Sequence, residues 1–228
     1  MGVHDGHRQR LKERFRAEGL DGFSEINALE LLLCYAIPRK DVNPAAHALM
    51  EYFGSYTKVM EASPAELKSV PGVGPETATF LALVTSAGRY YREKSLQPGA
   101  ILKTTEACAE YMQPFFFGRG NETIYMLCLD AKCKVIGCPM LGEGSATVAS
   151  VPIPKVVSMA VTLKASSVVL AHNHPSGLAM PSGEDEWFTV ELSQAMKAVG
   201  IKLADHIVFA DNDYVSMAQT PRLRQYFM

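Results

Sequence analysis

The sequence lacks the features that mark membrane-spanning, secreted and disulfide-stapled proteins. No stretch approaches the roughly 18–20 consecutive apolar residues that a membrane helix needs, which excludes an integral membrane protein. The N-terminal residues are polar and charged, without the apolar core of a signal peptide. The 5 cysteines are odd in number and include no Cys-x-x-Cys pair, so we interpret them as reduced thiols. These absences together predict a cytoplasmic protein.

The chain also has little net charge. It carries 22 basic and 24 acidic side chains, a formal net charge of −2, which argues against a protein that coats nucleic acid by electrostatics alone. A local basic patch remains compatible with this balance. Apolar residues make up 48% of the 228 positions, enough for a core, so disorder is excluded as the main state. The length fits one large domain or a small domain followed by a medium one.

Three of the cysteines, Cys128, Cys133 and Cys138, recur every five residues. This spacing has two interpretations. The residues either form a sulfur metal site or pack as small side chains in two neighbouring strands, and the packing interpretation is favoured because free cysteine behaves as a small hydrophobe.

The pattern of the chain changes near residue 95. Before it, apolar residues recur at helical spacing, which predicts helices over 8–17, 28–36, 44–53, 64–70 and 76–91. The segment 95–99 contains proline and glycine, which is typical of a linker. Beyond it we expect helices over 105–112, 155–164 and 184–199 and strands over 123–129, 134–139, 167–171, 202–210 and 214–217. We therefore predict an all-α domain (1–95) followed by a mixed α/β domain (101–228).

The most informative segment follows the predicted strand 167–171. His172 and His174 are two apart on an extended chain, so their side chains point to the same side. Pro175 ends the strand, and a loop rich in glycine and proline leads to Ser182 and Asp185 at the start of the next helix. Two imidazoles and one carboxylate that converge on a point form the ligand set of a catalytic zinc with an open fourth position.

Each part of this pattern also has a simpler interpretation. A His-x-His pair at a strand end is often structural, and Ser182-x-x-Asp185 is also a helix capping box. The combination at one strand-to-helix crossing favours a metal site. Asp205 and His206, on a later predicted strand, either orient a ligand imidazole from behind or are ordinary hydrogen-bonded structure, so both stay outside the predicted ligand set.

At these residues the chain resembles a known family. The segment Ala171-His-Asn-His-Pro-Ser-Gly with Pro181-Ser182 resembles the JAMM motif of the MPN (JAB) metallohydrolases, and in particular the RadC family. Further similarity extends over nearly the whole chain, as in Leu29-Glu-Leu-Leu-Leu33 and Asp205-His206-Ile207-Val208. The resemblance implies an α+β / α/β fold class: a small all-α helix-hairpin-helix domain followed by an MPN (JAB, cytidine-deaminase-like) α/β domain.

The resemblance also implies roles for individual residues. His172, His174 and Asp185 would hold Zn²⁺, and the family pattern places a general base at Glu122, with Glu143 as the rival position. The Ser182 hydroxyl would donate a hydrogen bond to the oxyanion of the tetrahedral intermediate. The implied activity is zinc-dependent hydrolysis of an amide or isopeptide bond in a protein or peptide substrate.

A second motif lies in the first domain, over residues 66–78. Gly72 and Gly74 form a Gly-x-Gly turn between two predicted helices, which resembles a helix-hairpin-helix that presents backbone N–H groups to a DNA phosphate. Lys68 adds positive charge, but Glu66 and Glu76 flank the turn, and a compact helical hairpin needs glycine for packing alone. DNA binding and mere packing both remain open.

Two functional hypotheses follow. The first is a zinc metallohydrolase that uses Glu122 and Ser182. The alternative is a DNA-repair or recombination accessory protein that binds DNA through the hairpin, with an inactive or structural metal site. A structural zinc adaptor is disfavoured because only three ligands are apparent.

Overall fold

The computed structural model describes residues 3–144, 148–175, 177–211 and 213–227, and for residues 3–5 and 149 the backbone only. The chain divides into two compact units, Met1–Gly88 and Arg89–Met228. This division falls within helix α6 (Pro75–Lys94). The domain limits 1–95 and 101–228 stay a prediction.

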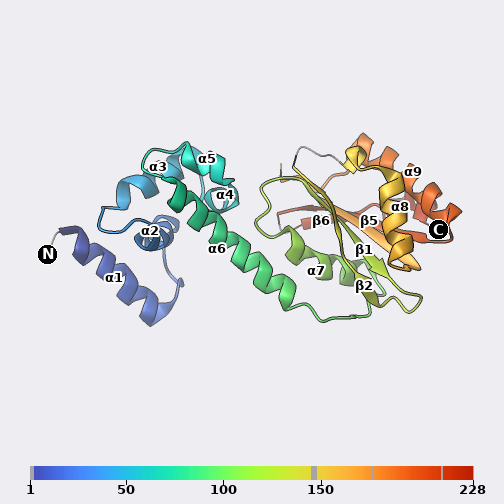
Figure 1. Cartoon of the computed structure of the whole chain (residues 1–228), viewed down its shortest axis with the longest axis horizontal. Helices are drawn as coiled ribbons and strands as arrows, with labels where there is room; N and C mark the ends of the chain where they lie inside the picture. Colours follow the sequence, from blue (N-terminus) through green and yellow to red (C-terminus); the bar gives the residue numbers. More distant parts are fainter. Residues whose placement is uncertain (1–2, 145–147, 176, 212, 228) are drawn as a thin grey trace. The chain divides into compact units, whose positions relative to one another are not determined.

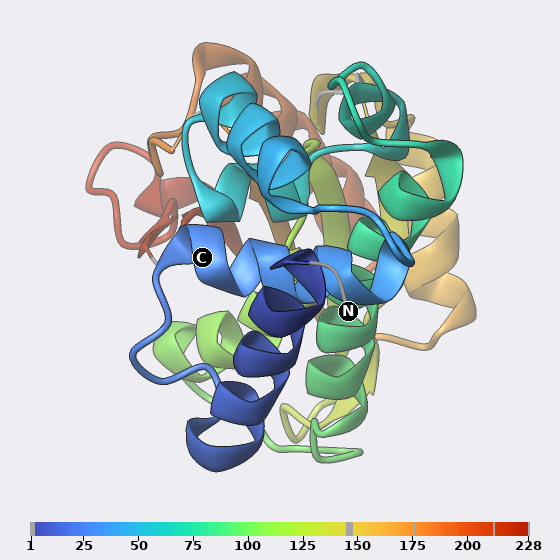
Figure 2. The same cartoon turned by 90° about the vertical axis from the view of Figure 1, so that its left-hand side faces the viewer.

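The first unit is built of helices (Figures 1 and 2). They are α1 (Val3–Glu18), α2 (Glu25–Ala36), α3 (Asn43–Phe53), α4 (Tyr56–Glu61), α5 (Pro64–Lys68) and the first part of α6. Ser24, Ser55 and Ser63 precede α2, α4 and α5, and each side chain accepts a hydrogen bond from a backbone N–H of its helix's first turn. The core of the unit is an apolar cluster whose fully buried leucines are Leu29, Leu33, Leu49, Leu67 and Leu81.

A buried carboxylate also holds this unit together. Glu30 on α2 is 1% exposed. Its two oxygens accept hydrogen bonds from the side-chain amides of Asn27 (3.0 Å) and Asn43 (2.7 Å), and the His7 ring lies 3.2 Å away. The bonds join α1, α2 and α3, so the acid is buried with its polar atoms satisfied.

The second unit is built on a six-stranded mixed sheet with the order β2-β1-β4-β5-β6, and β3 pairs with β1. Its strands are β1 (Thr123–Leu129), β2 (Val135–Gly137), β3 (Met140–Glu143), β4 (Ser167–Asn173), β5 (Lys202–Ala210) and β6 (Asp213–Ser216). The central pair, β4 and β5, is parallel, and β4 runs antiparallel to β1. Strand β4 is buried along nearly all of its length, as expected for a strand covered on both faces.

Helices cover both faces of the sheet (Figure 1). On one face, α8 (Ile153–Thr162) and α9 (Gly183–Ala198) pack over Ile124, Leu170 and Val208. On the other face, α7 (Thr105–Phe116) packs over side chains that alternate with these, such as Tyr125 and Ile207. His172 and His206 have the same strand parity as Leu170 and Val208, so both imidazoles lie on the α9 face.

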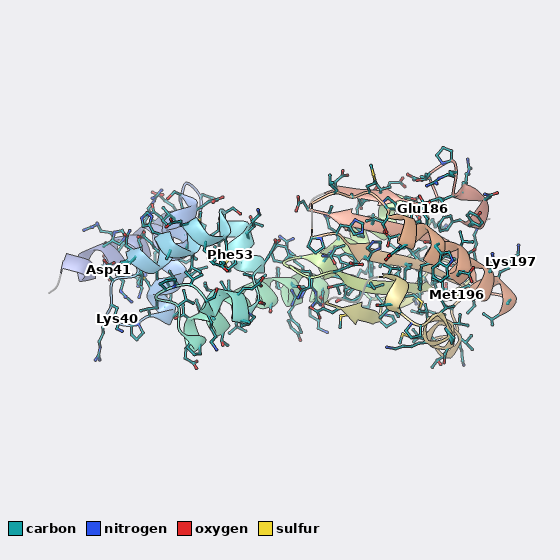
Figure 3. The ribbon with its side chains drawn as sticks, turned by 90° about the horizontal axis from the view of Figure 1, so that it is seen from above. Lys40, Asp41, Phe53, Glu186, Met196 and Lys197 are labelled. Carbon is teal, nitrogen blue, oxygen red and sulfur yellow. The ribbon has the colours of Figure 1, made fainter. Side chains whose placement is uncertain are left out.

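Helix α9 presents one polar segment within its buried stripe. The stripe consists of Asp185, Phe188, Thr189, Leu192 and Met196, at the spacing of one helix face. Met196 is buried, whereas its neighbour Lys197 is exposed; both are labelled in Figure 3. The carboxylate and the hydroxyl on this stripe are one turn apart and face the two histidines of the sheet.

The predicted fold class is confirmed: a helical first region with a helix-hairpin-helix precedes a mixed sheet-and-helix unit. The strands predicted over 123–129 and 202–210 have those limits in the structure, while β4 continues to Asn173. Helix α5 ends at Lys68, two residues before its predicted end, and neither α4 nor β3 was expected. Across the described part of the chain, no helix combines the length and apolar character that crossing a membrane requires.

Candidate metal centre

Three side chains converge where β4 ends and α9 begins. His172 is the second-last residue of β4, and His174 directly follows the strand. Asp185 is in the first turn of α9. The His172 and His174 Nε2 atoms are 2.9 Å apart, and Asp185 carboxylate oxygens lie 3.4 Å from His172 Nε2 and 3.6 Å from His174 Nε2. Among the described residues, this is the only group of three or more His, Cys, Asp or Glu side chains close enough to hold a metal ion.

The spacing of these atoms fits a small divalent cation. Bonds of about 2.0–2.1 Å at tetrahedral angles place neighbouring ligand atoms roughly 3.3 Å apart, close to the distances found here. The ring of His174 is oriented for this role, because its Nδ1 lies 3.1 Å from the Leu178 carbonyl oxygen. Nδ1–H donates to that carbonyl and leaves the Nε2 lone pair directed at the centre.

The electrostatics of the group also favour a cation. Burial raises the pKa of the Asp185 carboxyl, but the adjacent imidazoles of His172 and His174 and a hydrogen bond from Ser182 outweigh burial and hold that pKa well below its usual range. The nearby Asp185 carboxylate in turn raises the pKa of His174, against the effect of burial. The carboxylate therefore stays ionised and attracts positive charge to a point beside two ring nitrogens.

Ser182 caps α9 and fixes Asp185. Its hydroxyl oxygen accepts a hydrogen bond from the Asp185 backbone N–H (3.1 Å), and the hydroxyl donates to Asp185 Oδ2 (2.6 Å). The Ser182 backbone N–H donates to the same oxygen (2.7 Å). The sequence pattern Ser182-x-x-Asp185 is thus a capping box, and the same box presents the carboxylate to the histidines.

Glu122 stands at the edge of the same pocket. It immediately precedes β1, is half-buried, and lines a hollow of about 570 Å³ together with His174, Ser182, Gly183, Glu184 and Asp185. The rival acid, Glu143 on β3, forms an ion pair with Arg119 (2.8 Å) and does not line this hollow. The geometry thus brings Glu122, not Glu143, to the candidate centre.

The segment around Glu122 is held by the residue between the two histidines. Asn173 Oδ1 accepts a hydrogen bond from the Thr123 backbone N–H (2.8 Å), and its Nδ2 donates to the carbonyl of Asn121 (3.1 Å). The Glu122 carbonyl accepts from the Gly144 N–H (3.0 Å). Residues on either side of Glu122 are therefore tied to the turn that carries the histidines, a connection that the sequence pattern did not reveal.

Asp205 and His206 behave differently from each other. The Asp205 carboxylate faces α7 and β6, where Thr105 (2.9 Å) and Ser216 (2.7 Å) donate to it, and burial raises its pKa. His206 is fully buried on the α9 face, with Nε2 2.9 Å from His172 Nδ1. Burial lowers the pKa of His206 well below its usual value. Of the pair, only His206 contacts a candidate ligand.

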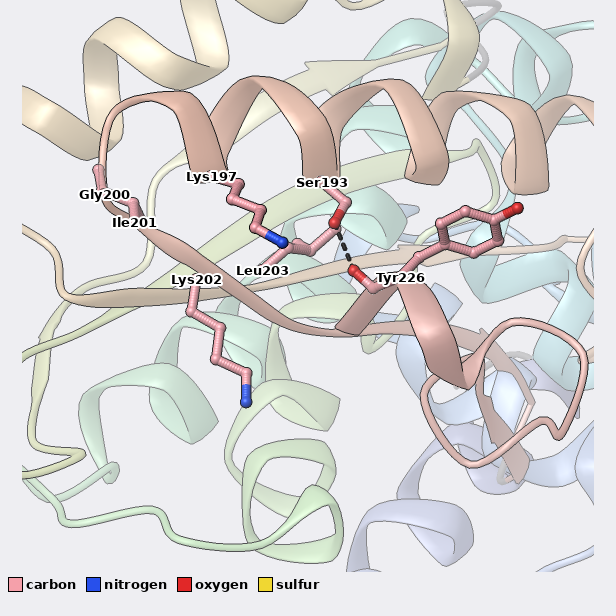
Figure 4. Close-up of a pocket in the computed structure, with 7 residues that line it drawn as sticks. All are labelled: Ser193, Lys197, Gly200, Ile201, Lys202, Leu203 and Tyr226. Carbon is pink, nitrogen blue, oxygen red and sulfur yellow. Dashed lines mark hydrogen bonds between the residues drawn. The ribbon is translucent and has the colours of Figure 1, made fainter. Parts of the chain in front are cut away.

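Other features lie apart from this centre. A second hollow of about 270 Å³ at the far end of α9 is lined by residues that include Lys197, Lys202 and Tyr226, and the Ser193 hydroxyl donates to the Tyr226 carbonyl there (Figure 4). It contains none of the predicted site residues. The spaced cysteines form no metal-binding group within the described residues; Cys128 is buried in β1, as the packing interpretation predicts.

The predicted hairpin residues lie in the first unit. Gly72 has φ +87°, in the region that favours glycine, and an added Cβ would meet the Ala45 side chain at 3.3 Å. Gly74 has open space around its Cα, and both glycines and Lys68 are exposed. Leu67, Val70 and Val73 point into the core. Packing therefore explains Gly72, whereas no atom of the described residues lies close enough to require glycine at Gly74.

Comparisons with known proteins find matches to both parts of the chain. A sequence profile described as the RadC-like JAB domain matches residues 102–223, and a helix-hairpin-helix motif matches residues 55–79. A UPF0758 protein of Polaromonas sp. is 35% identical over 210 residues, covering 92% of this chain and 94% of the relative. A UPF0758 protein of Fusobacterium nucleatum is 33% identical over 223 residues (95% and 96%), and one of Nitrosomonas eutropha is 33% identical over 211 residues (92% and 94%).

Proposed function

This chain belongs to the RadC family of JAB-domain proteins, and from that membership we propose that it is a zinc-dependent hydrolase of amide or isopeptide bonds. The observation that carries the proposal is the convergence of His172, His174 and Asp185. Two of these residues, His174 and Asp185, line one pocket together with Glu122 and Ser182. A module that only binds a metal or a partner has no need of a half-buried acid such as Glu122 at this pocket.

The ligand set supports zinc as the ion. Two imidazole nitrogens and one carboxylate oxygen are borderline-soft donors, and three protein ligands leave one position open, as in catalytic rather than structural zinc sites. Bound zinc would supply Lewis acidity and lower the pKa of its water to about 7. His172, His174 and Asp185 would hold the ion.

Glu122 and Ser182 would carry the proton transfer and the charge stabilisation. Glu122 accepts the proton of the attacking water and delivers it to the leaving nitrogen, as a general base that then acts as an acid. Ser182 donates its hydroxyl hydrogen to the oxyanion, a contact whose loss typically costs about 2.7–4 kcal/mol in the barrier. Because this hydrogen now bonds to Asp185, the hydroxyl must rotate when substrate binds.

The substrate class we propose is a protein or peptide, and the compartment is the cytoplasm. An amide carbonyl suits this arrangement because the open metal position and Ser182 would share its developing negative charge. All five cysteines are free, three of them buried, as expected of a chain that works in a reducing compartment.

A peptide-library cleavage screen with zinc-loaded protein tests the proposal. Glu122→Gln should bind zinc as the wild type does and lose hydrolysis. The matched control is Glu184→Gln, which removes an acid that lines the same pocket from α9 and should keep most of the activity. Cleavage by Glu122→Gln at the wild-type rate would refute the role of Glu122 as general base. Absence of zinc-dependent cleavage by the wild type would contradict the proposed hydrolase activity.

A second function, DNA binding, is favoured by the helix-hairpin-helix match over residues 55–79. We propose that the exposed turn at Gly72–Gly74, with Lys68, contacts the phosphate backbone without reading sequence. In an electrophoretic mobility shift with the whole chain, Lys68→Glu should weaken a salt-sensitive shift that wild type produces. No shift by wild type at low salt would leave the hairpin with a packing role alone.

A further inference from the structure

A chain of buried hydrogen bonds lies behind His172, on the side away from the pocket. His172 Nδ1 is 2.9 Å from His206 Nε2 on the neighbouring strand, and His206 Nδ1 is 2.5 Å from the Thr189 hydroxyl on α9. The Thr189 hydroxyl is in turn 2.6 Å from the backbone carbonyl oxygen of Asp185. His172, His206 and Thr189 are each 0% exposed.

The direction of these hydrogen bonds can be read from the Thr189 end. A carbonyl oxygen only accepts, so the hydroxyl donates its single hydrogen to the Asp185 carbonyl, one helical turn back. The other nearby acceptor, Met217 Sδ at 3.6 Å, is weaker. The hydroxyl oxygen is left as an acceptor facing His206, so His206 Nδ1 carries the hydrogen and donates.

The same logic continues through the two rings. A neutral imidazole with a hydrogen on Nδ1 has a lone pair on Nε2, so His206 Nε2 accepts and His172 Nδ1–H donates to it. His172 then has a lone pair on Nε2, the atom that faces His174 and Asp185. The Thr189 hydroxyl, acting through His206, thus determines which ring nitrogen of His172 carries no hydrogen.

We infer that His206 and Thr189 are positioning residues that hold His172 in its metal-binding tautomer and orientation. The inference rests on the metal site proposed above and adds residues to it. Metal-ligating histidines commonly donate their second ring N–H to such a partner. His174 uses the Leu178 carbonyl, whereas His172, fully buried, uses this two-residue relay.

The relay also connects one helix to two of the three proposed ligands, Asp185 and His172. Asp185 and Thr189 lie one turn apart on the buried face of α9. The first reaches the metal position with its side chain, and its backbone carbonyl orients the second. The same turn of helix therefore sets both the carboxylate and, through His206, the His172 ring.

Zinc affinity of matched Thr189 variants tests the inference. Thr189→Val keeps the side-chain shape and removes the hydroxyl, whereas Thr189→Ser keeps the hydroxyl and removes a methyl group. With zinc alone, titrated against a competing chelator, we expect Thr189→Val to bind about 10- to 100-fold more weakly and Thr189→Ser to stay within a few-fold of wild type. Equal affinity in wild type and Thr189→Val, or equal weakening in both variants, would overturn the inference.

The wild-type protein provides an independent measurement that needs no variant to fold. Two-bond ¹H–¹⁵N correlation NMR of the zinc-loaded protein reports which nitrogen of each histidine is protonated. The relay predicts His206 with hydrogen on Nδ1 and a bare Nε2; hydrogen on His206 Nε2 would overturn it. If wild type binds no zinc at all, the metal site fails together with the relay, an outcome distinct from normal zinc binding with the wrong tautomer.

Discussion

Asn173 shows how a single side chain can couple the metal-binding turn to the proposed base. Its neighbours His172 and His174 face the centre, so on the alternating strand its own amide points the other way. There it bonds to both sides of Glu122, through the Thr123 N–H and the Asn121 carbonyl. The amide is buried, at 6% exposure, so these bonds are shielded from water.

Replacing this side chain should therefore destabilise the site without removing the metal. In Asn173→Ala the buried Thr123 N–H loses its partner, and such an unsatisfied buried group costs about 1–3 kcal/mol. We expect the free energy of unfolding in denaturant titrations to fall by this order while zinc content stays at the wild-type level. Asn121→Ala, which removes an exposed side chain, is the control; loss of zinc in Asn173→Ala with unchanged stability would contradict this role.

Local spacing was informative for residues that are close in sequence and uninformative for partners that are distant. His172 and His174 face one side because strand side chains alternate, and the capping box at Ser182 follows from a pattern four residues long. Glu122 lies 50 residues upstream of His172, so only the family resemblance indicated it. The sequence around Thr189 does not indicate its role. A threonine on the buried face of an amphipathic helix can either pack or hydrogen-bond to a histidine, and the local pattern is the same in both cases.

At the scale of single elements, Glu30 joins three helices of the first unit. Glu30→Gln replaces one acceptor oxygen by an amide that cannot accept from Asn27 or Asn43. We expect the first unit to lose about 1–3 kcal/mol of stability, measured by the urea dependence of helix content. Glu51→Gln, on an exposed face of α3, should change stability by less than about 0.5 kcal/mol; equal effects of the two substitutions would refute the network's importance.

The capping box of α5 should make part of the stability of that unit depend on pH. Hydrogen bonds from the Ser63 hydroxyl and backbone N–H lower the pKa of Glu66. Since the folded pKa is below the unfolded one, this stabilisation is present above the unfolded pKa and disappears as the pH falls through the folded pKa.

Glu66→Ala should therefore cost about 0.3–1 kcal/mol at pH 7 and less at about pH 3. Chemical denaturation of wild type and variant at several pH values measures the difference. Glu51→Ala serves as the reference for an exposed acid, and a Glu66→Ala effect that grows as the pH falls would show that the sign is wrong.

The hydrophobic pattern of the sequence predicted the long helices and strands, but it did not predict the short elements α4 and β3. Strand β1 is a continuous apolar run, and its limits followed from the sequence. Strand β3, four residues long and containing Gly142, is held by pairing with β1, a long-range contact that no local pattern contains. Helix α4 has six residues and depends on the Ser55 cap and on burial of Val59, so its hydrophobic pattern is too short to recognise.

On the scale of the whole molecule, the two units carry separate features. The proposed ligands, base and relay all lie in Arg89–Met228, and the hairpin glycines lie in Met1–Gly88. The single tryptophan, Trp187, is on α9, two residues after Asp185, with its side chain 59% exposed. Its fluorescence therefore reports unfolding of the unit that would bind zinc.

Removal of metal should lower the thermal stability seen by this fluorophore. Free zinc at 100 times its dissociation constant stabilises the folded state by about 2.7 kcal/mol, and a chelator should abolish that gain. The control is the His172→Ala/His174→Ala variant, whose Trp187 transition should not respond to zinc or chelator. A zinc response of equal size in that variant would place the ion elsewhere in the chain.

The most direct test of the central claim is the zinc content of purified protein, measured by elemental mass spectrometry after growth with zinc. The account predicts about one zinc ion per chain for wild type and for Glu122→Gln, and a large loss for the folded His172→Ala/His174→Ala variant. Equal zinc content in wild type and the double variant would contradict the claim that these two imidazoles and Asp185 hold the metal.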